Sequence, residues 1–277
     1  PAALGISATL FNLAQFVGPA LGGVIVFWLG VTYAFSFNAA SFLGYFFVLF
    51  IIKLRYEEVV SRKTAGFIKE FKEGLIYIAE TPGLRRFLVL SLGVSLLMRA
   101  YRELFAGISD GIFGMGVEGL AILSSAAGLG AMFTAIFLGS FGKINGLIRI
   151  IMIGLVIAMV AQIVLATTNI FWVAVACAAV LSGTATYAGI GGQLLVQNTI
   201  HGAVRVRVMS IWGMILRGGP ASGAWMVGTL AGVSDLQFAF LTATFLFFII
   251  WLWTLRSTKR MAESLERSAE ERDADAL

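Results

Sequence analysis

Long runs of apolar residues without a charged side chain dominate this sequence. Residues 1–52 and 150–200 contain no Asp, Glu, Lys or Arg, and each run exceeds twice the roughly 20 residues that cross a bilayer as a helix. The runs are continuous rather than alternating, which favours helices over barrel strands. Breaks in the pattern predict eight membrane-spanning helices, at residues 4–29, 34–54, 86–106, 119–141, 147–167, 170–197, 207–232 and 235–256.

Composition indicates an all-α integral membrane protein. Of the 277 residues, 59% are hydrophobic and 13% are charged, against about 25% charged residues in soluble domains. A membrane explains the net charge of +5 better than nucleic acid does. The lone Cys177 lies in an apolar run and is expected to pack as a small core residue. Because the chain begins at Pro1 inside an apolar pattern, we expect further residues to precede it.

The distribution of Lys and Arg predicts which links are cytoplasmic, since cytoplasmic loops retain these residues. Of the 20 Lys and Arg residues, eight lie in residues 53–86, two in 143–149, two in 205–207 and five after residue 255. The intervening links contain none. We therefore expect a multi-pass protein of the inner (cytoplasmic) membrane, with both ends of the chain in the cytoplasm.

An internal repeat relates the first two predicted helices to the last two. At an offset of 201 residues, GPALGG at 18–23 aligns with GPASGA at 219–224, and 11 of the 38 positions from 18 to 55 are identical. If residues 86–256 are a six-helix bundle, residues 1–55 are the last two helices of a matching bundle that begins earlier. Six plus six helices in a parallel repeat is the plan of the Major Facilitator Superfamily, with helices 5 to 12 present here.

The two bundles are expected to be joined by a cytoplasmic linker, residues 56–85, and to be followed by a charged cytoplasmic tail, residues 257–277. Within the linker, apolar residues recur at helical spacing opposite Lys69, Glu70, Lys72 and Glu73. This pattern predicts an amphipathic helix on the cytoplasmic leaflet, with a solvated connector as the alternative. The apolar positions are Phe67, Ile68, Phe71, Leu75 and Ile78.

The stretch LAQFVGPALGG at 13–23 resembles the fifth-helix signature G-x-x-x-G-P-x-x-G-G of drug and metabolite antiporters in that superfamily. The proline removes a backbone hydrogen bond and bends the helix, while the glycines admit a neighbouring helix. The resemblance implies a bend that seals the outer side and a preference for exchange over uniport. A generic small-residue packing face is the alternative. Gly18, Pro19, Gly22 and Gly23 match the signature, Ala14 replaces its first glycine, and Gly219, Pro220 and Gly223 repeat it at the symmetric place.

Segments 82–104, 124–132 and 205–223 are similar to the branch that includes the enterobactin exporter and the transmembrane secretion effectors. With the signature, the resemblance covers residues 1–256. It implies a monomer that exports a drug, siderophore or metabolite by proton antiport through alternating access. Gln15 departs from the pattern, because relatives often carry a basic residue there.

Three arginines inside predicted spans need partners, because an ionised Arg at mid-helix costs about 2.5–3.5 kcal/mol. Arg99 and Glu103 are four residues apart and are expected to pair, and Glu103 is the candidate proton carrier. Arg102 is expected to snorkel to the outer interface. For Arg217, the substrate, a backbone carbonyl and an acid in the preceding helices are alternative partners.

Other polar residues of the predicted spans are candidates for lining a central cavity, although hydrogen bonds between helices would use them equally well. They are Asn12, Gln15, Asn38, Gln193, Gln197 and Asn198.

The sequence lacks the motifs that are typical of ATP binding, metal binding and hydrolytic catalysis. No Walker A pattern occurs, so an ion gradient rather than ATP is the expected energy source. The single histidine, His201, lies in a basic link, and no HExxH, catalytic triad or cysteine pair is present. We expect no enzyme activity, cofactor, metal or nucleic acid; the partners are a small-molecule substrate, a coupling proton and the bilayer. Uptake by the same fold, and a non-transporting sensor or scaffold, are the alternative functions.

Overall fold

The computed structural model describes residues 25, 29, 31–51, 66–141, 146–200 and 203–266, and every regular element in these ranges is helical. The main helices are α2 (Val31–Ile51), α3 (Phe67–Glu80), α4 (Pro82–Gly93), α6 (Gly116–Phe141), α7 (Leu147–Thr167), α8 (Phe171–Thr199), α9 (Ala203–Val233), α10 (Leu236–Leu255) and α11 (Thr258–Leu265). Short helical segments, η1 (Val94–Met98), η2 (Ala100–Arg102), α5 (Phe105–Gly107) and η3 (Ile108–Ile112), connect α4 to α6. The all-α prediction is confirmed.

Five of the described helices are long and apolar enough to cross a membrane, namely Thr32–Ile51, Gly116–Leu138, Leu147–Thr167, Phe171–Thr199 and Leu236–Leu255. They match five of the predicted spans. The predicted span at 207–232 is a helix, α9, but its three arginines make it more polar than the others. The predicted span at 4–29 lies outside the described residues, apart from residues 25 and 29.

The prediction of one regular helix at 86–106 is wrong. The segment starts earlier, at Pro82, and after Gly93 it passes into a π-helical turn, η1, and then a 3₁₀ turn, η2. It also meets α3 at a bend of 110°. Residue identity alone carries little information about such breaks, because a π turn persists only where neighbouring helices satisfy and shield the rearranged backbone.

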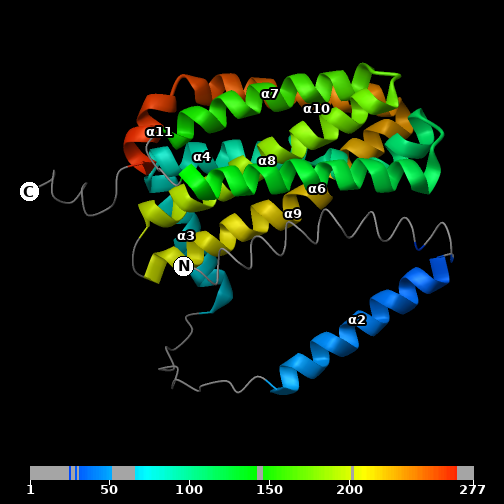
Figure 1. Cartoon of the computed structure of the whole chain (residues 1–277). Coiled ribbons are helices and arrows are strands. Elements are labelled where there is room, and N and C mark those ends of the chain that lie inside the picture. Colours follow the sequence, from blue (N-terminus) through cyan, green and yellow to red (C-terminus); the bar gives the residue numbers. More distant parts are fainter. Residues whose placement is uncertain are drawn as a thin grey trace, which may run out of the picture.

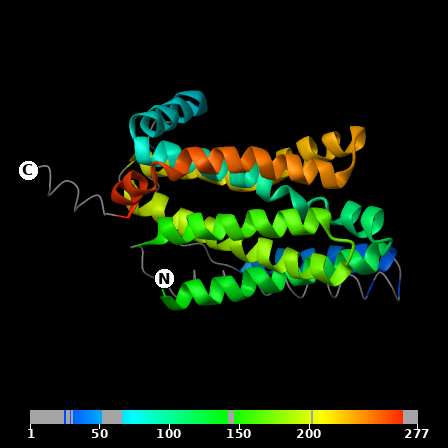
Figure 2. The same ribbon diagram turned by 90° about the horizontal axis from the view of Figure 1, so that it is seen from above.

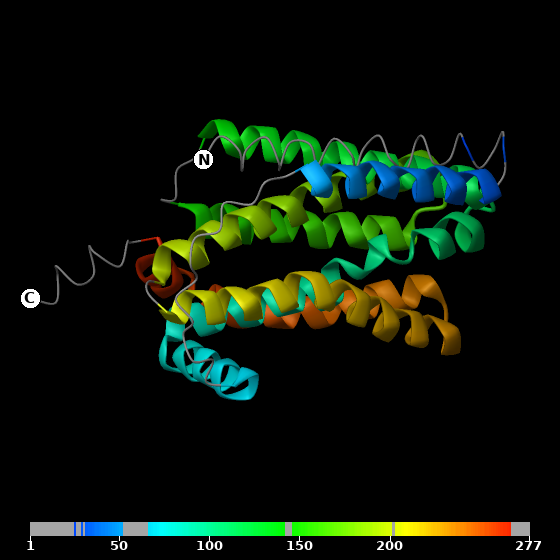
Figure 3. The ribbon, with the colours of Figure 1, turned by 90° about the horizontal axis from the view of Figure 1, so that it is seen from below.

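Helices α4 and α6 to α10 run along one common direction and form the bundle (Figures 1 and 2), whereas α2 stands apart from it in Figure 1. The α4–η1 segment lies centrally and contacts α7, α8, α9 and α10. Helix α6 packs mainly on α8, and α8 in turn on α7. The view from below shows α9 beside the α4 segment (Figure 3).

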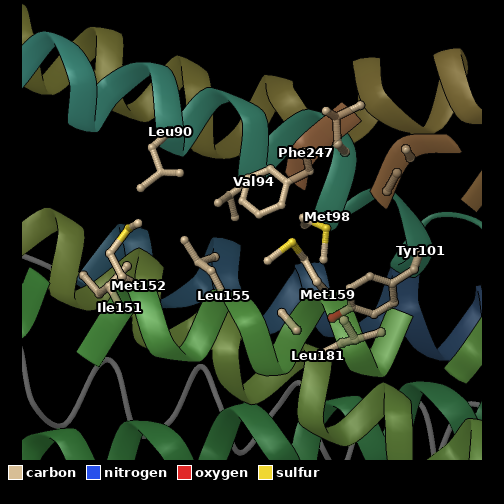
Figure 4. Close-up of a cluster of buried hydrophobic side chains, with 14 of the residues drawn as sticks. Leu90, Val94, Met98, Tyr101, Ile151, Met152, Leu155, Met159, Leu181 and Phe247 are labelled. Carbon is tan, nitrogen blue, oxygen red and sulfur yellow. The ribbon is translucent and has the colours of Figure 1, made fainter. Parts of the chain in front are cut away.

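The interior between α4–η1 and α7 is filled by aliphatic and methionine side chains. Leu90, Val94 and Met98 point from α4 and η1 toward Leu155 and Met159 of α7 (Figure 4). All five are buried. Methionine is unbranched and adapts its shape to its neighbours, so this layer can repack when helices shift.

The helix predicted in the linker is present as α3. Its Ile78 is buried and its Phe71 is half-buried against the core, whereas Leu75 is 43% exposed. Glu73 of α3 forms an ion pair with Arg207 of α9. The apolar face of α3 is therefore partly covered by the bundle, and the side chains of Phe67 and Ile68 lie outside the described residues.

The described basic residues at the starts of α4, α7 and α9 and in α11 lie at one end of the bundle. Helix α11 lies across this end and contacts α4, α7 and α8 (Figure 1). There the Ser264 side chain sits against Gly83, and the Glu266 carboxylate accepts hydrogen bonds from the backbone N–H groups of Gly146 and Ile148, at 2.8 and 2.9 Å. The carboxylate thus satisfies donors at the start of α7 that have no partner within the helix.

We expect Gly130→Ala to destabilise the bundle. A β-carbon at Gly130 in α6 would overlap the backbone carbonyl of Ala179 in α8, and such overpacking costs about 1–3 kcal/mol. Gly154→Ala in α7 is the control, because nothing lies within 4 Å of its β-carbon position, and Ala favours the helix by up to about 1 kcal/mol. Melting temperatures in detergent, followed by circular dichroism, check this. Equal melting temperatures for the two variants would contradict it.

Candidate functional site

A small cavity lies inside the bundle where α4, η1, α7, α8 and α9 meet. Its volume is about 10 Å³, roughly room for one water molecule. Most of its wall is apolar or small, including Ile151 and Leu155 of α7 and Gly189 of α8. Its polar side chains are Ser91, Ser95, Arg99 and Trp212.

Three of these polar side chains present hydrogen-bond donors that the described residues leave unused. Ser95 Oγ and Trp212 Nε1 are buried without a hydrogen-bond partner, and the Arg99 side chain forms no ion pair or hydrogen bond with another described residue. The fourth, Ser91, already donates to the Phe87 carbonyl at 2.8 Å. Since buried donors and buried charges are costly without an acceptor, this wall is suited to a group that is rich in acceptors or negatively charged.

The broken helix beside the cavity is held by a buried glutamine. Gln162 of α7, fully buried, donates from Nε2 to the Leu97 carbonyl of η1 at 3.2 Å and to Thr244 Oγ1 of α10 at 3.1 Å. One side chain therefore joins α7, η1 and α10. Sequence reasoning missed Gln162; the signal was a single amide within the apolar run of α7.

The repeated glycine motif packs against the same broken helix. A β-carbon at Gly223 would overlap the Leu96 carbonyl of η1, and one at Gly219 would lie 2.5 Å from the β-carbon of Ser95. Pro220 lies between them, half-buried, inside a continuous α9. The motif residues that the sequence placed in α9 thus lie directly behind the donor-lined cavity. Sequence reasoning missed Ser95 and Trp212, because neither pattern nor charge marks them as polar groups facing one cavity.

The expected pair of Arg99 and Glu103 is wrong. The π turn of η1 and the 3₁₀ turn of η2 break the spacing of 3.6 residues on which the pairing rested. Arg99 consequently lines the cavity, whereas Glu103 is exposed and no ion pair joins the two. Arg102 is half-buried and has an interaction of its own.

Arg217 lies on a second surface, the exposed face of α9. Ser210, Met214, Arg217, Ala221 and Ser222 recur along this face at helical spacing, and all five are exposed. The corresponding faces of α7 and α10 are apolar, as expected for contact with lipid. Because polar and small side chains are interspersed with exposed apolar ones such as Met214 and Trp225 on α9, this face is suited to another helix or to a polar pathway.

The remaining candidates do not join the cavity. Asn38 is exposed on α2, Gln193 is exposed on α8, and Gln197 is half-buried near the basic end of α8. Among the described residues, no group of three or more His, Cys, Asp or Glu side chains is placed to hold a metal. Seven candidates lie outside the described residues: Asn12, Ala14, Gln15, Gly18, Pro19, Gly22 and Gly23.

We expect Gln162→Leu to loosen the broken helix. It removes both hydrogen bonds at nearly constant volume, which in membrane bundles costs about 0.6–1.7 kcal/mol. Thr167→Val is the control, because the Thr167 hydroxyl bonds only to carbonyls of its own helix. Melting temperatures should fall for Gln162→Leu only. In a double-mutant cycle with Thr244→Val, additive effects would show that the two side chains are not coupled.

Comparison with known proteins identifies the family. A family model described as transmembrane secretion effector matches residues 1–276. A search of curated proteins found no match to the chain. Since the family model covers nearly the whole chain and the described residues form a helical bundle with several membrane-spanning helices, this protein belongs to the transmembrane secretion effector family of Major Facilitator Superfamily transporters.

Proposed function

We propose that this transporter exports a small molecule by proton antiport and that Arg99 contacts the transported molecule or its counter-ion during the cycle. The observation that carries the proposal is the donor-lined cavity, in which Arg99, whose side chain has no ion pair or hydrogen bond to any described residue, stands with Ser95 and Trp212. An ionisable side chain inside a membrane bundle without a protein partner is a mark of a transport pathway. The family supplies membrane transport; export and proton coupling are our proposal.

The surroundings of the cavity support a role in alternating access. The cavity borders η1, and π turns of this kind are frequent at functional sites. Gly223 lets α9 approach the Leu96 backbone of this segment, and Gly219 lets it approach Ser95. A contact of this kind allows α9 to slide or tilt without rotating bulky side chains, and the methionines Met98 and Met159 can repack. The cavity volume of about 10 Å³ fits a closed state that widens when α9 moves.

The separation of Arg99 from Glu103 supports different roles for the two charges. Arg99 faces the cavity, where it suits an acceptor-rich or anionic group. Glu103 is exposed at the far end of the broken helix, where it can exchange a proton with water. We keep Glu103 as the candidate proton carrier and assign substrate contact to Arg99 and, on the exposed face of α9, to Arg217.

The proposed topology places the α11 end of the bundle in the cytoplasm. Apart from Arg99, Arg102 and Arg217, the described Lys and Arg residues lie in α3, at the starts of α4, α7 and α9, or from the end of α10 onward, and cytoplasmic surfaces carry this excess. In this proposal residues 86–256 are the C-terminal bundle, residues 1–55 belong to the N-terminal one, and α3 lies at the cytoplasmic interface.

Transport direction is tested in everted membrane vesicles, with enterobactin as an acceptor-rich anionic probe and ethidium as a cationic one. With an acidic lumen, we expect enterobactin to accumulate because protons leave as it enters, and nigericin to abolish the accumulation by collapsing the pH gradient. Accumulation in intact cells but not in everted vesicles would establish uptake. No transport of either probe in either system would contradict the proposal in favour of a sensor or scaffold.

The role of Arg99 is tested in the same vesicles with Arg99→Gln and Arg99→Lys. Loss of a charge-assisted hydrogen bond of about 1.5–3 kcal/mol corresponds to about a 10- to 100-fold loss of enterobactin transport for Arg99→Gln, with partial recovery in Arg99→Lys. Arg85→Gln, at an exposed position at the start of α4, is the matched control and should transport normally. Equal activity of Arg99→Gln and Arg85→Gln at equal expression would remove Arg99 from the pathway.

A further inference from the structure

We propose that the basic end of the bundle holds an anionic phospholipid in a pocket between α7, α10 and α11. The pocket has a volume of about 900 Å³, within the range of about 300–1,000 Å³ that ligand sites occupy. It is separate from the donor-lined cavity and shares no residue with that cavity's polar wall. The proposal does not depend on the direction of transport.

Charge is the first argument. Four basic side chains line the pocket, one from α7, one at the end of α10 and two from α11, and all are exposed and without an ion pair to any described residue. They are Arg149, Arg256, Lys259 and Arg260. Cations gathered at the membrane surface attract anionic headgroups, and basic pockets between membrane helices hold them.

Glu266, the one carboxylate among the described residues of the wall, does not neutralise these cations. Both oxygens of Glu266 accept hydrogen bonds from backbone N–H groups at the start of α7, those of Gly146 and Ile148. The carboxylate is thereby tied to the helix terminus, and its negative charge is balanced by the positive end of α7. Among the described residues, no other carboxylate of the wall complements the four basic side chains, and an anion from outside the protein would do so.

The shape of the wall distinguishes a lipid from a soluble anion. Below the basic rim, the wall continues with Ile153, Val156 and Leu255, which belong to the exposed apolar faces of α7 and α10. An acyl chain can follow this face while the phosphate remains at the rim. Trp251 stands in the wall and donates from Nε1 to the Met152 carbonyl at 3.2 Å, and tryptophan is enriched at the depth of lipid headgroups.

Helix α11 is also suited to the depth of the lipid headgroups. Its Met261 and Leu265 are buried against the bundle, while Lys259, Arg260 and Glu263 are exposed. The helix lies across the ends of α4, α7 and α8 (Figure 1), as an interfacial amphipathic helix does. A bound lipid would therefore join α11 to α7 and α10 and fix the geometry of this end of the bundle.

The test is a competition between lipids for the purified full chain. The protein in detergent is given equimolar phosphatidylglycerol and phosphatidylcholine, and native mass spectrometry measures the ratio of the two lipids retained. We expect phosphatidylglycerol to be favoured. The triple variant Arg256→Gln/Lys259→Gln/Arg260→Gln should reduce the ratio of phosphatidylglycerol to phosphatidylcholine about tenfold. It removes three of the four cations that attract the anionic headgroup.

The matched control removes three exposed cations from the same end of the bundle but outside the pocket, Lys69→Gln/Lys72→Gln/Arg85→Gln. It should retain the preference for phosphatidylglycerol. Equal losses in the two triple variants would overturn the proposal, because general surface charge would then account for the binding. Melting temperatures in lipid-free detergent confirm that both variants are folded.

Two further arms locate the lipid and exclude other occupants. Phosphatidylglycerol brominated on its acyl chains should quench Trp251 fluorescence, so the quenched fraction should fall in Trp251→Phe; an unchanged fraction would place the lipid elsewhere.

Soluble glycerol phosphate should not displace the lipid at equal concentration, and displacement would show that the apolar wall contributes nothing. If phosphatidylglycerol binds only after residues 267–277 are removed, the acidic tail is the occupant and the lipid proposal fails.

Discussion

The need to satisfy backbone polar groups away from water is the constraint on which this bundle depends. A regular helix meets it internally, but the α4 segment does not stay regular: it changes to a π turn and then to a 3₁₀ turn in the middle of the bundle. An irregular backbone is tolerated at this depth only when protein encloses it. Gln162 supplies a donor to the Leu97 carbonyl, and α9 covers Ser95 and Leu96.

Small residues make that enclosure feasible. Between membrane helices there is little hydrophobic driving force, so close van der Waals packing and interhelical hydrogen bonds hold the bundle together. Gly219 and Gly223 bring α9 onto the broken segment, and Gly130 brings α6 onto α8. Because these glycines have no side chains, the helices can approach closely. For the same reason, no side chains of the glycines interdigitate with the neighbouring helix. The glycine motif therefore contributes to the stability of the bundle and, in the function we propose, also permits the movement of α9 that alternating access requires.

The cavity and the lipid pocket share one electrostatic feature, basic side chains that form no ion pair with a described residue. Arg99 is a cation inside the bundle whose side chain has no partner among the described residues, and the cations around α11 form no ion pair with any described residue. A transported acceptor group would satisfy the first for part of the cycle, and a resident anionic headgroup would satisfy the second throughout. Lipid that holds α7, α10 and α11 would provide a fixed side against which α9 moves.

The sequence by itself determined the class of the protein and the bounds of most helices. Apolar runs and the clustering of Lys and Arg reflect the free energy of transfer from water to lipid, and each segment's own composition sets that free energy. It also pointed to Gly219, Gly223 and Arg99. Tertiary structure decided the break in the α4 segment, the failure of Arg99 to pair with Glu103, and the meeting of Ser95, Trp212 and Arg99 at one cavity. Those outcomes depend on which neighbouring helix packs against the broken backbone and on the hydrogen-bond donors that it supplies. A sequence pattern read with a regular helical period contains no information about these neighbours.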